Sequence, residues 1–228
     1  MDDKEKKPLL VSIAVLGGTG KEGKGLAYRW ARAGYRVLIG SRSSERAVTA
    51  ASEIMSLLDG SPSIVGMDNL EAAEQANIVV LTVPYAAHRD TLESVKDALK
   101  GKILIDVTAP LVPPKVTKVQ MPAAGSAAQE AKEIVGDGVE VVAAFQSISH
   151  EHLVGEEDID CDVLVTGSSK AARAEALTLV EAAGLTGWDA GPIENSVVVE
   201  GLTSVLININ KQYGSTHAGI KITGANRK

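Results

Sequence analysis

The chain has little cysteine, few aromatic side chains and no long apolar run. Cys161 is the single cysteine among 228 residues, which excludes an internal disulfide and a thiolate metal cluster. We therefore expect a reducing cytoplasm as the location of the protein. No apolar run approaches the roughly 20 residues that span a bilayer, so we expect no membrane association. The charged start lacks a signal-peptide core, and we expect residues 1–8 to form a disordered tail.

Basic charge and aromatic content are also low. The net charge of −6 leaves no basic stripe to neutralise phosphates, so we expect no nucleic-acid partner and a small soluble ligand instead. Hydrophobic residues make up 45% of the chain but aromatics only 3%. The core must therefore be built from Val, Ile, Leu and Ala, as is typical of buried parallel strands and their covering helices.

Short apolar runs alternate with helical stretches over the first two thirds of the chain. Strands are predicted at 9–16, 36–40, 63–67, 78–83, 102–107 and 139–144, with helices at 22–33, 44–58, 70–75, 86–99 and 126–135. This order predicts an α/β fold with a doubly wound (Rossmann) parallel sheet over residues 9–145. The segment 109–122 contains four prolines, which predict an irregular loop of the length that often carries function.

The remaining residues 146–228 predict a second, smaller α/β domain. They contain a strand at 162–166, a helix at 170–183, a short strand near Trp188 and a helix at 195–213. This piece is too short for the long all-helical domain that many two-domain dehydrogenases add to a dinucleotide fold.

A glycine-rich turn follows the first predicted strand. Gly18, Gly20 and Gly23 have the Gly-x-Gly-x-x-Gly spacing of dinucleotide-binding proteins, and Thr19, Lys21 and Glu22 stand between them. The phosphates would rest on the free N–H groups of the helix that begins there. A glycine-rich turn without a ligand is the alternative.

The end of the second strand indicates which dinucleotide binds. An NAD enzyme places an acidic side chain about 20 residues beyond the glycines. This chain has Ser41, Arg42 and Arg46 there, which offer a hydroxyl and two guanidinium groups to the 2′-phosphate of NADP. The alternative is that both arginines are solvated helix-start residues, although cations oppose the helix dipole at that end.

Catalytic side chains are scarce. The four histidines are His88, expected on a helix face, His150 and His152, expected at the cleft edge of the sheet, and His217. No third ligand follows the His150 and His152 pair at a known spacing, so we expect no metal. None of the tyrosines begins the Tyr-x-x-x-Lys pair that a short-chain reductase would use as its acid. By elimination, we expect hydride exchange between NADP and a second redox cofactor, with no catalytic acid or base.

Landmarks along almost the whole chain resemble the NADPH-dependent reductases of the deazaflavin coenzyme F420, the F420H2:NADP oxidoreductases. In chain order they are Leu16-Gly17-Gly18-Thr19-Gly20, Gly23-Lys24-Gly25, Gly40-Ser41-Arg42, Leu81-Thr82-Val83-Pro84, Pro110-Leu111-Val112-Pro113, Asp189-Ala190-Gly191-Pro192, Asn195-Ser196, Glu200, Leu202-Thr203 and Gly219-Ile220-Lys221. The resemblance implies a reductase that exchanges hydride between NADP and coenzyme F420.

The resemblance also implies which residues hold each part of the two cofactors. The residues implied for the NADP phosphates are Thr19, Gly20, Lys21, Glu22, Ser41, Arg42 and Arg46. Val83, with Pro84 beside it, Val112 and His150 would line the nicotinamide end. The deazaflavin would stack on the nicotinamide beneath the C-terminal unit, near Ile148, Thr203 and the closing Gly219-Ile220.

Three positions depart from the family pattern on the deazaflavin side. Gln146 stands where the family can have histidine, Val197 where it can have arginine, and Gly201 where it can have serine. Two alternatives therefore stay open: a reductase of the same fold with a flavin, quinone or ferric chelate as acceptor, and a non-enzymatic NADPH-sensing module. A homodimer is also expected, because the last helix carries more apolar side chains than one buried face requires.

Overall fold

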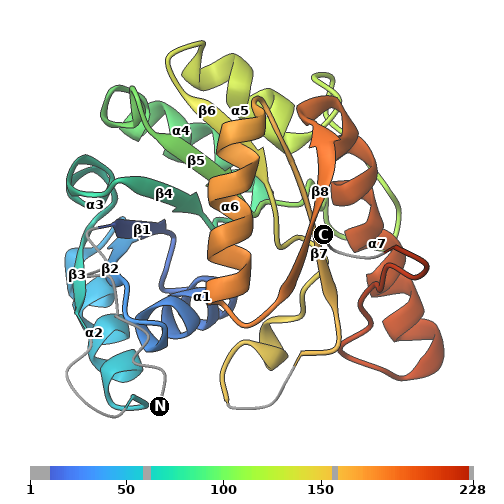
Figure 1. Cartoon of the computed structure of the whole chain (residues 1–228), viewed down its shortest axis with the longest axis horizontal. Coiled ribbons are helices and arrows are strands. Elements are labelled where there is room, and N and C mark those ends of the chain that lie inside the picture. Colours follow the sequence, from blue (N-terminus) through green and yellow to red (C-terminus); the bar gives the residue numbers. More distant parts are fainter. Residues whose placement is uncertain (1–10, 59–62, 156–158, 226–228) are drawn as a thin grey trace.

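A single eight-stranded sheet forms the centre of the molecule (Figure 1). The computed structural model describes residues 11–58, 63–155 and 159–225. The tail expected at residues 1–8 lies outside the described residues. The strands are β1 (Ser12–Leu16), β2 (Arg36–Ser41), β3 (Ile64–Asp68), β4 (Ile78–Leu81), β5 (Ile103–Asp106), β6 (Glu140–Ala143), β7 (Asp162–Gly167) and β8 (Thr186–Pro192).

The strand order β3-β2-β1-β4-β5-β6-β7-β8 reverses direction between β1 and β4. Val15 in β1 pairs with Ile39 in β2 on one side and with Val80 in β4 on the other, all in parallel register. In open α/β sheets, ligands bind outside the carboxyl ends of the strands at such a switch point. The topology therefore places the expected site at the ends of β1, β2, β4 and β5.

Helices cover both faces of the sheet. They are α1 (Lys21–Arg32), α2 (Ser44–Met55), α3 (Asn69–Gln75), α4 (His88–Val95), α5 (Ala127–Val135), α6 (Lys170–Ala182) and α7 (Ser196–Tyr213), with short 3-10 turns η1 (Tyr85–Ala87), η2 (Lys96–Leu99), η3 (His150–His152) and η4 (Ile193–Asn195). Side chains alternate along β1: Ile13 and Val15 join the core beneath α1, α2 and α6, whereas Ala14 and Leu16 join the core beneath α3, α4 and α5. Because the strands are buried on both faces of the sheet, they appear in the sequence as continuous apolar runs.

The predicted α/β doubly wound class is confirmed, with one correction to the sheet. It is mixed, because β7 runs antiparallel to β6, with Ala143 opposite Thr166. The described chain between β6 and β7 contains only the short η3 and no crossover helix, so it stays at one edge of the sheet and β7 runs back from there. β7 and β8 thus extend the sheet of the first 145 residues rather than forming a separate one.

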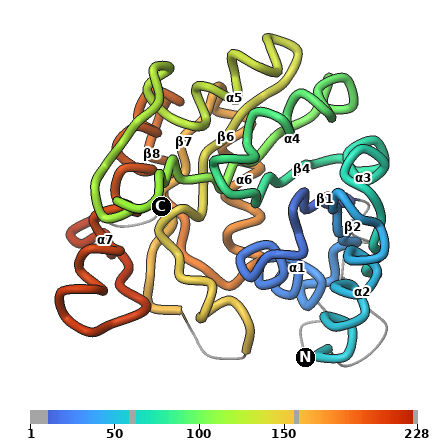
Figure 2. Tube along the Cα trace, turned by 180° about the vertical axis from the view of Figure 1, so that it is seen from behind, coloured from blue at the N-terminus to red at the C-terminus, as the bar shows by residue number. Residues whose placement is uncertain are grey.

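The C-terminal segment also contacts the long loop between β5 and α5. In Figure 2 this loop passes beside α7, where the Ser204 hydroxyl donates to the carbonyl oxygen of Lys118 at 3.4 Å. As predicted, the segment 109–122 contains no helix or strand. The division into two domains at residue 145 remains a prediction; it falls shortly after the end of β6.

Candidate functional site

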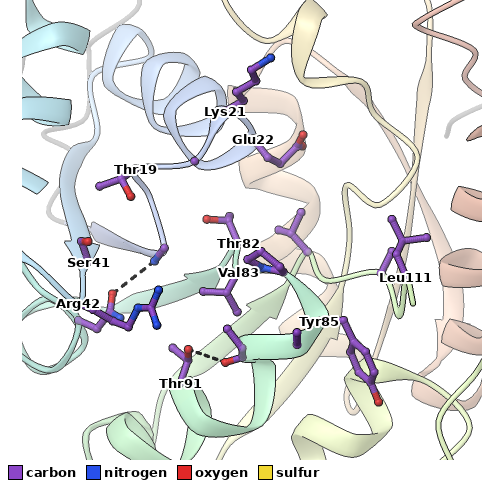
Figure 3. Close-up of a pocket in the computed structure, with 18 of the residues that line it drawn as sticks. Thr19, Lys21, Glu22, Ser41, Arg42, Thr82, Val83, Tyr85, Thr91 and Leu111 are labelled. Carbon is purple, nitrogen blue, oxygen red and sulfur yellow. Dashed lines mark hydrogen bonds between the residues drawn. The ribbon is translucent and has the colours of Figure 1, made fainter. Parts of the chain in front are cut away.

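A cleft of about 860 Å³ opens at the carboxyl edge of the sheet. Its walls come from the turn after β1, the end of β2, the turn after β4 and the loop after β5. Figure 3 shows Ser41 and Arg42 on one side of this cleft and Tyr85 and Leu111 on the other. The residues that line it are Gly17, Thr19, Gly20, Lys21, Glu22, Ser41, Arg42, Ser43, Arg46, Asn69, Thr82, Val83, Pro84, Tyr85, Ala86, Ala87, Thr91, Val107, Ala109, Leu111, Pro113 and Val116.

The glycine turn brings the backbone of α1 to the cleft. A Cβ on Gly18 would lie 2.7 Å from the Val15 carbonyl oxygen, and one on Gly23 would lie 2.6 Å from Thr82 Oγ1. These two glycines therefore allow close packing, while Thr19 and Gly20 line the cleft itself. No side chain caps the start of α1, so its first N–H groups are available to an anion.

The end of β2 supplies a hydroxyl, and the turn after it and the first turn of α2 supply two cations. Ser41 is buried and accepts a hydrogen bond from the N–H of Ser43 at 3.3 Å, whereas Arg42 and Arg46 are exposed at the cleft. Among the described residues, no carboxylate forms an ion pair with either arginine. Both guanidinium groups can therefore turn toward a ligand phosphate.

The opposite end of the cleft is mostly apolar. Val83 and Pro84 line it, as does the aromatic ring of Tyr85, which sequence analysis did not single out. The Tyr85 hydroxyl points away from the cleft and donates to Glu130 at 2.8 Å. Burial and this bond raise the pKa of Tyr85 to about 12. Val112 is not among the lining residues and is 41% exposed, whereas its neighbour Leu111 lines the cleft.

Neither the residues expected near the deazaflavin, Ile148 and Thr203, nor His150, which was expected at the nicotinamide end, are among those that line the cleft. Ile148 is buried and His150 half-buried, and Thr203 donates to the carbonyl oxygen of Gln146 at 2.9 Å. The Gln146 side-chain amide donates to the Asp106 carbonyl oxygen at 2.8 Å. Among the described residues, Gln146 Oε1 and the hydroxyl of Ser147 are buried and have no hydrogen-bond partner.

A buried ionisable pair lies behind the apolar end. His88 begins α4, is fully buried, and bonds through Nε2 to the Asp106 carboxylate at 2.7 Å. Burial alone would lower the pKa of His88, but the hydrogen bond and charge of Asp106, with Glu130 beyond, raise it. This pair could not be predicted from the sequence, because only the fold brings the end of β5 to the start of α4. Neither residue lines the cleft.

Two further carboxyl groups are buried. Burial and the neighbouring Asp106 raise the pKa of Glu200 to about 8, although its oxygens accept from the N–H groups of Ala127 and Ala128 at 2.6 and 3.0 Å. Burial alone raises the pKa of Glu22, in the cleft wall, to about 8. Neither pKa shift could be predicted from the sequence, because both depend on the packing around the carboxyl group.

The described part of the chain contains no group of three or more histidine, cysteine, aspartate or glutamate side chains that could hold a metal ion. Within the same residues, no helix has both the length and the apolar character needed to cross a membrane.

Comparison with known proteins shows the family. A model of the family described as NADP oxidoreductase coenzyme F420-dependent matches residues 12–110. An F420-dependent NADP reductase from Methanothermobacter marburgensis is 42% identical over 93% of this chain and 98% of the relative. One from Methanocaldococcus jannaschii is 35% identical over the same shares. The chain belongs to the F420-dependent NADP reductase family.

A solved structure agrees with this membership. The crystal structure of a candidate F420-dependent NADP reductase from Arthrobacter sp. FB24 matches with a TM-score of 0.77 at 27% identity. The match covers 93% of this chain and 99% of that one. The likeness in sequence and in fold thus extends over nearly the full length of the matched chains.

Proposed function

We propose that the chain transfers hydride between NADP(H) and coenzyme F420 in the cleft at the carboxyl edge of the sheet. The observation that carries the proposal is the identity of 35–42% to F420-dependent NADP reductases over nearly the whole length of both chains. A binding cleft at the switch point of the sheet supports it independently.

For the NADP half, we propose that the pyrophosphate rests on the N-terminus of α1, beside Thr19, Gly20 and Lys21. The 2′-phosphate would lie between Ser41, Arg42 and Arg46, which line the same end of the cleft. The nicotinamide would then extend toward Val83 and Pro84 at the apolar end. Asn69 also lines the cleft and accepts from the N–H of Gly17 at 3.4 Å, which supports the turn.

For the acceptor half, we propose that the deazaflavin binds over the nicotinamide, bordered by Ile148, His150, Thr203 and the loop with Val112. The unpartnered oxygens of Gln146 and Ser147 are polar atoms that a ligand ring could use. When bound, the two cofactors would supply the chemistry, a hydride transfer between the nicotinamide C4 and the deazaflavin C5. The protein has to hold these carbons about 3–3.5 Å apart, which needs positioning more than acid-base catalysis.

The absorbance of oxidised coenzyme F420 tests the proposal. We expect the deazaflavin band to disappear when catalytic amounts of the protein are mixed with F420 and NADPH, and to persist with NADH. A parallel reaction with flavin mononucleotide identifies the alternative acceptor. An unchanged F420 band in a sample that binds NADPH would contradict the F420 assignment. Reduction of flavin mononucleotide in the parallel reaction would then show that a flavin is the acceptor.

We further propose that the chain acts as a homodimer in a reducing cytoplasm. α7 supports the dimer, since it leaves Val198 64% exposed and Val205 43% exposed. The location rests on the single cysteine, Cys161, which is free and buried.

A further inference from the structure

One carboxyl group in the cleft has no counter-charge. Glu22 is the second residue of α1, and its Oε1 is buried without a hydrogen-bond partner among the described residues. The same side chain lines the cleft. Burial raises its pKa to about 8, so it is mostly protonated in the empty protein at neutral pH.

The helix geometry places Glu22 away from the adenosine end. Residues three apart share a helix face, so Glu22 lies on the same face of α1 as Gly25. A Cβ on Gly25 would lie 2.5 Å from Leu153, so this face packs against η3 and the residue that follows it. In Figure 3, Glu22 lies on the Leu111 side of the turn, away from Ser41 and Arg42.

The ionisable groups around Glu22 do not neutralise it. On α1, Lys21 is exposed, and Lys24 pairs with Glu53 of α2. The buried Arg29 lies two turns further along α1, where it donates to the carbonyl oxygens of His152 and Leu153. On the segment facing Glu22 the ionisable groups are His150, Glu151 and His152, with His217 of the C-terminal segment stacked edge-on against His152. Across the cleft are Tyr85 and, behind it, the His88 and Asp106 pair. None of these has a resolved effect on the pKa of Glu22, which is shifted by burial.

We propose that Glu22 makes the preference of the cleft for oxidised or reduced nicotinamide depend on pH. This inference rests on the proposed function, which places the nicotinamide at the end of the cleft that Glu22 faces. The nicotinamide ring is a cation in NADP+ and neutral in NADPH. The ionised carboxylate therefore stabilises bound NADP+, whereas the protonated form favours NADPH.

The comparison of the two nucleotides isolates this effect. Their phosphates are the same, so phosphate repulsion on Glu22 cancels in the ratio of the two dissociation constants. Coupling is reciprocal: if ionised Glu22 strengthens NADP+ binding, NADP+ lowers the pKa of Glu22 and releases its proton to the buffer. A decrease of one pKa unit corresponds to a tenfold change in relative affinity.

Nucleotide binding to the intact protein tests the proposal without turnover of F420. Dissociation constants for NADP+ and NADPH are measured by calorimetry between pH 6.5 and pH 9. We expect the ratio of the NADPH constant to the NADP+ constant to rise about sevenfold over this range in the wild type. The ratio should stay within about twofold in Glu22→Gln, which keeps the shape but cannot ionise. Glu133→Gln, an exposed glutamate on α5, should follow the wild type.

A second measurement needs only the wild-type chain. Calorimetry at pH 8 in two buffers with different heats of ionisation counts the protons released on binding. We expect NADP+ to release about 0.4 proton more than NADPH. Equal release for both nucleotides, or an equal rise of the ratio in Glu22→Gln, would overturn the role of Glu22 while leaving the proposed function intact. Failure of the wild type to bind either nucleotide would overturn both.

Discussion

At the scale of single residues, we expect Arg42 to set the preference for NADP. It lines the cleft next to the buried Ser41 and has no ion-pair partner among the described residues. We expect Arg42→Glu to weaken NADPH binding about 100-fold, because a charge-assisted hydrogen bond worth roughly 1.5–3 kcal/mol is replaced by repulsion. NADH lacks the 2′-phosphate, so its affinity should change less than about threefold. Fluorescence titration with both nucleotides measures the difference.

Arg36 provides a matched control for Arg42. It lies at the other end of β2, where it bonds to the Gln75 side chain at 3.4 Å and is exposed. Arg36→Glu should leave both affinities unchanged. Equal losses of NADPH and NADH binding in Arg42→Glu would argue against a 2′-phosphate site at this position.

Glu22 also makes the stability of the fold depend on pH. Its pKa is about 8 in the folded chain, against 4.5 for an ordinary solvated glutamate, so between these values the folded chain holds a proton that the unfolded chain has lost. The unfolding free energy therefore falls as pH rises from about 4.5 to 8. We expect Glu22→Gln to raise the unfolding free energy by about 2–4 kcal/mol at pH 8 and to leave it nearly unchanged at pH 4.5. Urea unfolding at the two pH values measures this, and an equal change at both would contradict it.

Some site residues could be predicted from the sequence and others could not. Thr19, Gly20, Ser41 and Arg42 follow strand ends at fixed offsets from the glycines, and all of them line the cleft. Tyr85 and Leu111 also line it, but their place depends on how the turn after β4 and the loop after β5 fold over the apolar end of the cleft. The functional roles of all these residues remain predictions.

At the scale of elements, Glu200 joins α7 to the start of α5. Its carboxyl oxygens accept from the N–H groups of Ala127 and Ala128, and Ser126 caps the next free N–H, that of Gln129, at 3.0 Å. We expect Glu200→Ala to lower the unfolding free energy by about 2–4 kcal/mol, because it leaves two buried N–H groups without partners. Glu133→Ala, on an exposed position of α5, is the control. Denaturant unfolding at pH 7 measures both, and a loss below about 0.5 kcal/mol in Glu200→Ala would contradict this role.

Most helices and strands could be predicted because the apolar pattern of the sequence agrees with the residues that begin and end each element. Each predicted strand overlaps an observed one, and the helix predicted at 44–58 begins at Ser44 with Ser43 as its cap. The stretch 86–99 was predicted as one helix but divides into the end of η1, α4 and η2. The antiparallel direction of β7 was missed, because it depends on the path of the chain after β6 and not on the apolar pattern of β7 itself.

At the scale of the whole molecule, one sheet connects the cleft to the C-terminal segment that we expect to complete the site. Residues at or just beyond the ends of β1 to β5 line the cleft, while β7 and β8 extend the sheet toward α7 and the residues expected near the deazaflavin. In Figure 1, α7 lies at the edge of the molecule opposite α2 and α3. This arrangement leaves one side of α7 without a partner in the described chain.

The exposed side of α7 supports association of two copies. Val198, Leu202, Val205 and Ile209 follow one another at spacings of four, three and four residues, the pattern of paired helices. Leu202 is half-buried and the other three are exposed. A stripe of this kind on a long helix is typical of a surface that a second helix covers.

Sedimentation velocity tests the dimer. We expect the wild type to sediment at twice the chain mass of 23.7 kDa, and Val198→Lys combined with Val205→Lys to sediment as a monomer, because two charges would be buried at the interface. Val48→Lys, which alters a valine on α2 that is 52% exposed, should leave the dimer intact. A monomeric wild type at micromolar concentration would contradict the proposal. A dimer that survives both lysines would assign the interface to another surface, because no helix pair could bury this stripe with two lysines in its centre.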